Sequence, residues 1–451
     1  MDATTTVNAI LLPRFDKQIK MAFHHGGSYR WDNIKRNGKR SWQGKGRYFE
    51  FTLYEQAEYG GGSRAEQGNM PTSDVEGYQA GRVFNTLHYR RIGITGLLAA
   101  AATGGDDSIA DEKVQKTKNA VANMKADMAR QMWQDGTGIL CSINNAAGYA
   151  VGTSTFAVDA PGNWVDGAGT ALTQGCRFLR VGMRVAIGQP NDLLGTSGTA
   201  PIYRKIASIN RAGSTFTVTV ALGAGETIAN NALVVLGPGG TVNDNNSLRE
   251  MWGVLGSVTN TTPALWGEFS AAAVAGFATG YAGIDTAAHP LFVSYVRHFS
   301  GSPQEFDSRL LPDALSFMKE LNDDQQVVKL ITWHPSMTSE YAATLEGDIR
   351  QVPRKQVGGY DMPVFTYGGE IPIEEEGHCP IGHILLDDPK TWELAILQDI
   401  GFKRFAGETW WEDDETDSAR ARLEFKGNCF LPERWKAGLI RDIRVTRAPA
   451  Y

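Results

Sequence analysis

Two strand-like segments on either side of a polar, glycine-rich stretch constrain this chain more than any other feature of its sequence. Residues 48–54 alternate apolar and polar side chains, as a half-buried strand does. Residues 58–74 (EYGGGSRAEQGNMPTSD) are rich in residues that end regular structure, and residues 75–95 return to a strand-like pattern. Because a two-stranded ribbon is only marginally stable in water, a ribbon of this length needs a partner. The sequence offers no obvious partner nearby, so we expect the ribbon to pack on another molecule.

The clearest helix predicted from the sequence covers residues 109–132, directly after the ribbon. Ser108 followed by Asp111 is a capping pattern, and apolar side chains recur at helical spacing along one face. This face comprises Val114, Val121, Met124, Met128 and Met132. We interpret the methionines as core packing rather than as part of a cofactor site.

Residues 150–240 differ in composition from their flanks and predict a small all-β module. They are rich in Gly, Thr, Ser and Val, and short alternating runs occur at 180–187, 202–210, 216–220 and 233–236. The edges of the module resemble linkers, so we interpret it as an insertion into a larger unit. Further elements are predicted downstream: helices over 269–281, 311–321 and 336–345, and strands over 327–332, 392–397 and 418–430. The fold class is α+β.

Charge is unevenly distributed along the chain. Residues 1–47 hold ten Lys and Arg against three Asp, and residues 361–420 hold fifteen Asp and Glu against four Lys and Arg. Residues 1–40 show no sustained apolar period and predict an extended basic arm. The arm could meet the acidic flank of another copy or a nucleic acid, or both surfaces could simply be solvated. For His24, His25 and Trp31, packing against a neighbouring copy is favoured over a nucleic-acid contact.

Composition is that of an ordinary globular protein. The 451 residues are 42% apolar and 21% charged with a net charge of −6, which argues against wholesale disorder and allows roughly two to four domains. We recognise neither a secretory signal nor an apolar run long enough to span a bilayer, so we expect a soluble protein made in a cytosol. Four cysteines, without a CxxC pair, are expected to be reduced thiols: Cys141, Cys176, Cys379 and Cys429.

The search for catalytic and ligand-binding motifs is largely negative. The common nucleotide-binding, zinc-protease, hydrolase and calcium-loop signatures are absent from the sequence. The spacing of His378, Cys379 and His383 matches no standard metal site. The acidic runs 374–376 and 412–417 offer paired carboxylates, but such runs are usually solvated. We therefore predict no catalytic residue, no metal and no cofactor.

The order of these elements resembles the major capsid proteins of tailed bacteriophages, which have the Hong Kong ninety-seven fold. The resemblance covers nearly the whole chain: a basic arm, a long two-stranded loop with a glycine-rich tip, an amphipathic helix, then mixed helices and strands. It is strongest in residues 88–133 (HYRRIGITGLLAAAATGGDDSIADEKVQKTKNAVANMKADMARQMW), in 331–345 (ITWHPSMTSEYAATL) and in 361–373 (DMPVFTYGGEIPI).

The resemblance implies a domain organisation. It gives an N-terminal arm (1–41), an extended loop (42–95), a peripheral domain with a spine helix (96–149), the inserted β domain (150–240), a peripheral-to-axial region (241–316), an axial domain (317–398) and a return to the peripheral domain (399–451). The minimal family pattern lacks the insertion.

The resemblance also implies a shell subunit, not an enzyme, that assembles into hexamers and pentamers through its loop and arm. The residues expected at contacts between copies are Arg36, Arg40, Trp42, Arg47, Phe49, Phe51, Tyr54, Tyr59, Arg64, Glu66 and Met70. The expected location is the virion, with assembly in the host cytoplasm and no membrane. The shell would enclose double-stranded DNA without reading its sequence.

The resemblance also implies partners other than further copies of the chain. We expect a separate scaffolding protein and a portal, and a decoration protein is compatible with the insertion. Because the loop tip contains no lysine, we expect no covalent crosslinking between subunits. The alternatives are an encapsulin-type compartment shell, which shares the fold, and a carbohydrate-active hydrolase that uses the late acidic residues.

Overall fold

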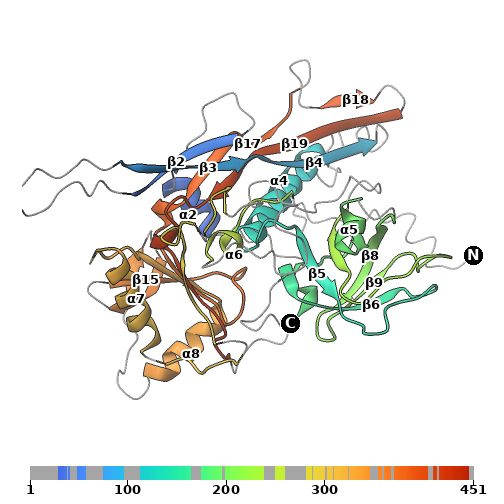
Figure 1. Cartoon of the computed structure of the whole chain (residues 1–451). Coiled ribbons are helices and arrows are strands. Elements are labelled where there is room, and N and C mark those ends of the chain that lie inside the picture. Colours follow the sequence, from blue (N-terminus) through green and yellow to red (C-terminus); the bar gives the residue numbers. More distant parts are fainter. Residues whose placement is uncertain are drawn as a thin grey trace, which may run out of the picture. The chain divides into compact units, whose positions relative to one another are not determined.

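A computed structural model gives the structure of the protein (Figure 1). It describes residues 29–37, 39–40, 48–56, 75–95, 112–163, 174–195, 199–237, 249–259, 281–286, 288–299, 302–307, 309–323, 325–345, 354–357, 360–366, 370–404, 410–413 and 416–445. Contacts divide the chain into two compact units. The smaller includes His88–Asp127 and Gln398–Phe425, and the larger includes Ser28–Leu87, Met128–Leu397 and Lys426–Tyr451. Each unit mixes helices and strands, in line with the α+β prediction.

A two-stranded antiparallel ribbon forms where the sequence predicts it. Strand β2 (Tyr48–Gln56) pairs with β3 (Gly77–Phe84), with Tyr48 opposite Phe84 and Tyr54 opposite Tyr78. The prediction that the strand region 75–95 forms the second side of the ribbon is correct for β3 and wrong for the residues after it. The chain breaks at Asn85, and β4 (Thr86–Thr95) leaves the ribbon to pair with β19 (Thr416–Phe430) instead.

The smaller unit contains most of the long helix and several strands. Helix α4 (Glu112–Gln131) confirms the helix predicted over 109–132, and it continues into the larger unit. Strands β4, β17 (Glu393–Phe402), β18 (Trp411–Asp413) and β19 contribute the sheet. The core of the unit is Ile92, Ala120 and Ala421 with Phe402 and Trp410 packed against them. Along α4 and just beyond it, Met124, Met128 and Met132 are buried, which confirms their packing role.

A closed six-stranded barrel occupies the middle of the chain (Figure 1). Its strands, in barrel order, are β10 (Leu233–Leu236), β5 (Ile139–Ile143), β6 (Thr155–Asp159), β9 (Thr215–Val218), β8 (Ile202–Asn210) and β7 (Arg184–Gly188). Short helix α5 (Pro190–Leu193) follows β7. The expected all-β module is therefore present, but it takes one strand, β5, from before residue 150. Burial alternates along β6 and β9, and Phe156 and Phe216 of these strands fill the interior with their ring centroids 5.4 Å apart.

A seven-stranded mixed sheet forms the other part of the larger unit. Its strand order is β11 (Tyr295–Arg297), β20 (Gly438–Ile440), β16 (Ile384–Asp387), β12 (Leu330–Trp333), β15 (Glu370–Glu375), β14 (Tyr360–Thr366) and β13 (Arg354–Val357). Two of these strands, β11 and β20, lie outside the predicted axial range 317–398. Helices α7 (Leu310–Leu321) and α8 (Pro335–Leu345) match the predicted helices 311–321 and 336–345. The predicted helix 269–281 lies almost wholly outside the described residues.

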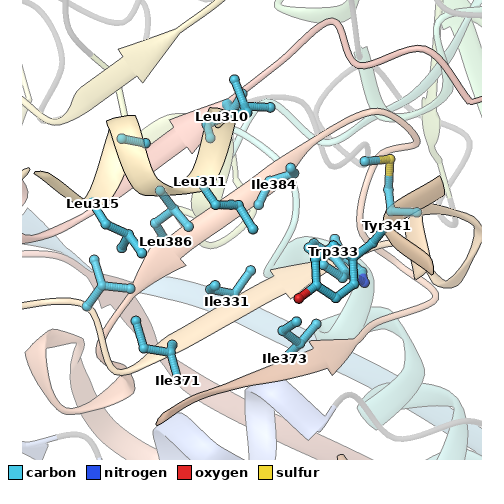
Figure 2. Close-up of a cluster of buried hydrophobic side chains, with 14 of the residues drawn as sticks. Leu310, Leu311, Leu315, Ile331, Trp333, Tyr341, Ile371, Ile373, Ile384 and Leu386 are labelled. Carbon is cyan, nitrogen blue, oxygen red and sulfur yellow. The ribbon is translucent and has the colours of Figure 1, made fainter. Parts of the chain in front are cut away.

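Figure 2 shows how α7 and α8 cover this sheet. Leu311 and Leu315 of α7 point at Ile331 and Leu386, and Tyr341 of α8 lies beside Trp333. The rings of Trp333 and Tyr341 are 5.4 Å apart, and Trp333 is fully buried. Burying such large side chains contributes roughly 1.5–3 kcal/mol each, so this cluster is a principal source of stability.

The extended arm predicted over residues 1–40 is wrong where the structure describes it. Residues Tyr29–Asn37 form helix α2, and a two-residue strand β1 (Lys39–Arg40) then pairs with β17. Trp31 and Ile34 are buried at i and i+3, and Arg30 is buried beside them. The helix is therefore part of this chain's own core. A further short helix, α6, covers Val254–Ser257.

Candidate assembly surface

The inner face of the ribbon packs on the body of the same chain. Phe49 and Phe51 are partly buried, with ring centroids 5.5 Å from that of Phe430. Leu53 and Val83 from the same face are buried. The expectation that the ribbon has no partner in its own chain is therefore wrong for this face.

Gly81 permits this packing. It lies opposite Phe51 in the ribbon, and a Cβ placed on it would lie 2.3 Å from the Phe51 ring. The ring can therefore cover the backbone of β3 only because residue 81 lacks a side chain. The backbone N–H of Arg82 donates to the carbonyl of Ala282 at 2.7 Å, which fixes the same strand to the body.

The outer face of the ribbon is exposed and rich in tyrosine. Tyr48, Tyr54 and Tyr78 are 40%, 51% and 56% exposed. The rings of Tyr54 and Tyr78 are 5.3 Å apart, and those of Tyr48 and Phe84 are 5.9 Å apart. Between the two pairs, Arg82 Nε lies 2.8 Å from Glu50 Oε1, and the Arg82 guanidinium lies 5.2 Å from the Tyr48 ring. Tyrosine and arginine of this kind are enriched at protein interfaces.

The residues predicted to contact other copies differ in where the structure places them. Tyr54 lies on the exposed face of the ribbon, whereas Phe49 and Phe51 lie on the face that packs inward. Arg36 is exposed at the end of α2, where its Nε donates to the carbonyl of Asp32 at 3.3 Å. Arg40 is described by its backbone alone, and the others lie outside the described residues: Trp42, Arg47, Tyr59, Arg64, Glu66 and Met70. Contact with a neighbouring copy stays a prediction for all of them.

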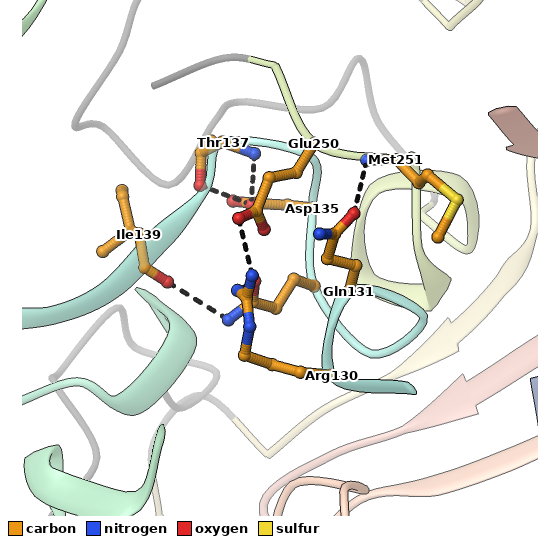
Figure 3. Close-up of polar contacts among 8 residues, drawn as sticks. Arg130, Gln131, Asp135, Thr137, Ile139, Glu250 and Met251 are labelled. Atoms are coloured by element: carbon orange, nitrogen blue, oxygen red, sulfur yellow. Dashed lines mark hydrogen bonds and ion pairs between the residues drawn. The ribbon is translucent and has the colours of Figure 1, made fainter. Parts of the chain in front are cut away.

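A buried polar network fixes the two connections of the barrel (Figure 3). Arg130, at the end of α4, lies 2.6 Å from Glu250 on the returning connection, and both side chains are buried. The next residue, Gln131, accepts a hydrogen bond from the Met251 backbone at 3.2 Å. The backbone N–H of Val254 donates to Met132 O at 2.8 Å. The segments that enter and leave the barrel are thus joined side by side at the end of α4.

The turn from α4 into β5 is held in the same network. Gln134 donates from Nε2 to the carbonyl of Ile139 at 3.1 Å, and it accepts a hydrogen bond from Arg130. Asp135 Oδ1 accepts from the N–H and the hydroxyl of Thr137 at 3.0 and 2.6 Å. Removing one charge of a buried pair such as Arg130–Glu250 typically costs 3–5 kcal/mol. The network therefore fixes how the barrel joins the body.

The acidic run 374–376 is not the solvated loop that the sequence suggests. Glu374 is the penultimate residue of strand β15 and Glu376 directly follows the strand, and they are 1% and 4% exposed. Glu375, between them, is exposed and accepts from the Thr338 hydroxyl at 2.5 Å. Alternation along a strand explains the pattern, because it turns every second side chain to the core. For residues 412–417 the side chains lie outside the description.

In the histidine and cysteine cluster, Cys379 and His383 are buried and His378 is half-buried. Burial lowers the pKa of His383 to about 4, and its Nδ1 lies 3.2 Å from the Ile381 carbonyl. Burial raises the pKa of the Cys379 thiol well above its ordinary value. Arg177 of the barrel donates to the carbonyls of Gly377 and Cys379. The segment 377–379 therefore contacts the barrel module through Arg177. Among the described residues, no group of three or more His, Cys, Asp or Glu side chains is placed so that it could hold a metal ion.

The four cysteines are all buried and unbridged. No helix within the described part of the chain is both long and apolar enough to cross a membrane.

Comparison by sequence finds no relatives. No protein-family model matches the chain, and no curated protein matches it.

Comparison by fold finds solved structures that align with this chain over nearly their whole length. The cyanophage A-1(L) capsid asymmetric unit matches with a TM-score of 0.52 at 10% identity, over 97% of this chain and 98% of that chain. The capsid of a native GTA particle matches with a TM-score of 0.48 at 8% identity, over 98% of each chain. The SrpI encapsulin complex of Synechococcus elongatus PCC 7942 matches with a TM-score of 0.46 at 7% identity, over 99% of this chain and 98% of that chain. The first of these matches shows that this chain shares the fold of the cyanophage capsid structure.

Proposed function

We propose that this chain is the major capsid protein of a tailed bacteriophage and assembles into the icosahedral shell around its DNA. The observation that carries the proposal is the likeness in fold to the cyanophage capsid subunit, which extends over 97% of the chain. A match of that extent leaves no large part of the chain over for a separate catalytic domain.

The ribbon provides the contact between copies in this proposal. Its inner face is satisfied by Phe430 and its own body, so the remaining contact surface is the outer face with Tyr48, Tyr54 and Tyr78. A rigid ribbon anchored at its base can cover a neighbouring copy at little entropic cost, because its strands are already ordered. In this proposal the inner face of the ribbon packs on its own chain, and the outer face packs on a neighbouring copy.

The barrel is the proposed insertion, and its role follows from its attachment. The Arg130–Glu250 network and the Arg177 contacts bind it firmly to the body, so it is a rigid part of the subunit surface. Such a module is a suitable site for a decoration protein. A scaffolding protein, a portal and double-stranded DNA are the other proposed partners.

Electron microscopy of the purified protein tests the assignment. We expect rings of five or six subunits, or closed particles, in negative stain. A stable monomer at high concentration, with and without a co-expressed scaffolding protein from the same genome, would contradict it. Particles isolated from the native source should contain DNA, and an enzyme cargo in its place would identify a compartment shell instead.

A further inference from the structure

Helix α2 buries an arginine beside its apolar core residues Trp31 and Ile34. Arg30 is 1% exposed, and its Nη2 donates to Asp387 Oδ2 at 2.6 Å. Trp392 Nε1 donates to the same carboxylate oxygen at 2.7 Å. The guanidinium lies 4.8 Å from the Trp392 ring and 5.6 Å from the Trp133 ring. The polar part of the attachment of α2 to the sheet therefore depends on the charge balance around this one cation.

The carboxylates around Arg30 outnumber it. Glu374, on β15, interacts electrostatically with Arg30, Glu376 and Asp387. Glu376 Oε2 accepts from the backbone N–H of Arg30 at 3.4 Å, and its Oε1 lies 3.1 Å from His378 Nδ1. If all three carboxyls were ionised, one buried guanidinium would face three negative charges. Such an arrangement is unfavourable in a low-dielectric interior, where a carboxyl instead keeps its proton.

The other titratable groups that face the cluster do not correct this imbalance. Cys429, on β19, faces Arg30, and burial raises the pKa of its thiol to about 12. Cys379 faces Glu374 and Glu376, and burial keeps its thiol neutral as well. Arg177 faces Cys379 from the barrel side and donates to backbone carbonyls. No further cation is shown facing Glu374 among the described residues.

Several polar atoms of the cluster lack a protein partner. Within the described part of the chain, neither carboxyl oxygen of Glu374 has a hydrogen bond, and the same holds for Arg30 Nε, Arg30 Nη1 and Asp387 Oδ1. Buried polar groups are almost always satisfied, and ordered water commonly satisfies those that protein atoms do not reach. These five atoms belong to Arg30 on α2, Glu374 on β15 and Asp387 on β16.

We propose that Glu374 keeps its proton in the folded protein at neutral pH, that buried water links it to the Arg30–Asp387 pair, and that this proton holds helix α2 in the core. With Glu374 neutral, Asp387 neutralises Arg30, and the Glu374 hydroxyl is a donor for the water. Loss of the proton places an uncompensated negative charge between β15 and α2. The helix then loses its packing at alkaline pH before the rest of the larger unit does.

The direction of the pH effect follows from the shifted pKa. Burial, and to a smaller extent the charge of Glu376, raises the pKa of Glu374 from 4.5 to about 9, although the positive charge of Arg30 lowers it. The folded state therefore holds one more proton than the unfolded state between these two values. Stability from this group falls as pH rises, with about a tenfold change in the unfolding equilibrium constant per pH unit. Above pH 9 the dependence on Glu374 ends.

The test compares the wild type with Glu374→Gln, which mimics the protonated acid, and with Glu375→Gln as the matched control. Glu375 is the exposed neighbour on the same strand. Unfolding is measured with denaturant between pH 7 and 9, where the buried histidines are neutral in both states. We expect the unfolding constant of the wild type to rise about 50-fold relative to Glu374→Gln, because Glu374 is half ionised in the folded state at pH 9, and we expect Glu375→Gln to follow the wild type. The proposal would be overturned if the unfolding constants of all three proteins changed with pH in parallel.

A spectroscopic readout separates protonation from a merely structural role. The infrared band of a protonated carboxyl, shifted by ¹³C-glutamate labelling, should be present in the wild type and in Glu375→Gln at pH 8 and absent from Glu374→Gln. If Glu374→Gln does not fold, the labelled wild type decides alone, and absence of the band at pH 8 overturns the proposal. Hydrogen exchange, corrected for its intrinsic rate, should show α2 losing protection above pH 9 in the wild type. The experiments use the isolated subunit and do not depend on the proposed shell.

Discussion

The two faces of the ribbon should respond to mutation in opposite ways, and this is the sharpest consequence of the structure. Tyr48 and Tyr54 expose 40% and 51% of their surface, about 180 Å² together if a tyrosine offers roughly 200 Å². At ~25 cal/mol per Å², full burial under a neighbour contributes at most about 4 kcal/mol per contact. If half of this is realised, the double variant Tyr48→Ala/Tyr54→Ala loses about 2 kcal/mol per contact. The critical concentration for assembly should then rise about 30-fold.

The inner face gives the opposite result. Phe51 packs on Phe430 and Phe292 of its own chain, so Phe51→Ala should lower the free energy of unfolding of the subunit by about 2–3 kcal/mol. The tyrosine double variant should leave subunit stability unchanged, because its side chains are exposed. Sedimentation across a concentration series measures assembly, and denaturant unfolding of dissociated subunits measures stability. Tyr89→Ala, a tyrosine 53% exposed on β4, is the matched control. Assembly of the double variant at wild-type concentration would refute the proposed contact.

Three further predictions concern the body of the subunit. Arg30→Met should lower the free energy of unfolding by about 3–5 kcal/mol, because it leaves Asp387 buried without its cation, and an unchanged denaturant midpoint would contradict this. Gly253→Ala should cost about 1–3 kcal/mol, because the new Cβ would lie 2.3 Å from the Gln131 carbonyl oxygen; a melting temperature equal to the wild type would speak against the close approach. Burial lowers the pKa of His383 from 6.5 to about 4, so stability should fall as pH decreases between these values, by about 3 kcal/mol relative to His383→Asn, and curves that stay parallel would be the contrary result.

The long periodic elements could be predicted from the sequence because they carry their own signal. The helix at 109–132 repeats its apolar face over several turns, and the structure has it at Glu112–Gln131. The strands predicted at 202–210 and 233–236 are found at the same positions, Ile202–Asn210 and Leu233–Leu236. For the helix, the local apolar period agrees with the buried face, which includes Met124 and Met128. The strand at 233–236 is a short apolar run, and most of its length is buried.

Features that depend on distant partners could not be predicted. Helix α2 spans nine residues and turns only a short buried stripe, Trp31 and Ile34, to the core. Its anchor, Asp387, lies 357 positions away from Arg30 along the chain. Glu374 is buried because it lies on the inward face of β15, although the sequence around it looks like a solvated acidic loop. A buried cation has no local sequence signature, so neither residue could be assigned correctly.

The candidate surface was predicted only in outline. Alternation in residues 48–54 shows that the ribbon has two faces, but it does not say which face the chain covers itself. That choice is made by Phe430 and Phe292, which lie far away in sequence. Phe49, Phe51 and Tyr54 were therefore grouped together, although they lie on different faces.

A cryo-electron microscopy map of the assembled protein tests the central claim most directly. We expect the outer face of the ribbon, with Tyr48, Tyr54 and Tyr78, to lie against a neighbouring copy while Phe49 and Phe51 stay on their own Phe430. Particles in which that tyrosine face remains open to solvent, or a protein that forms no particles at all, would contradict the account.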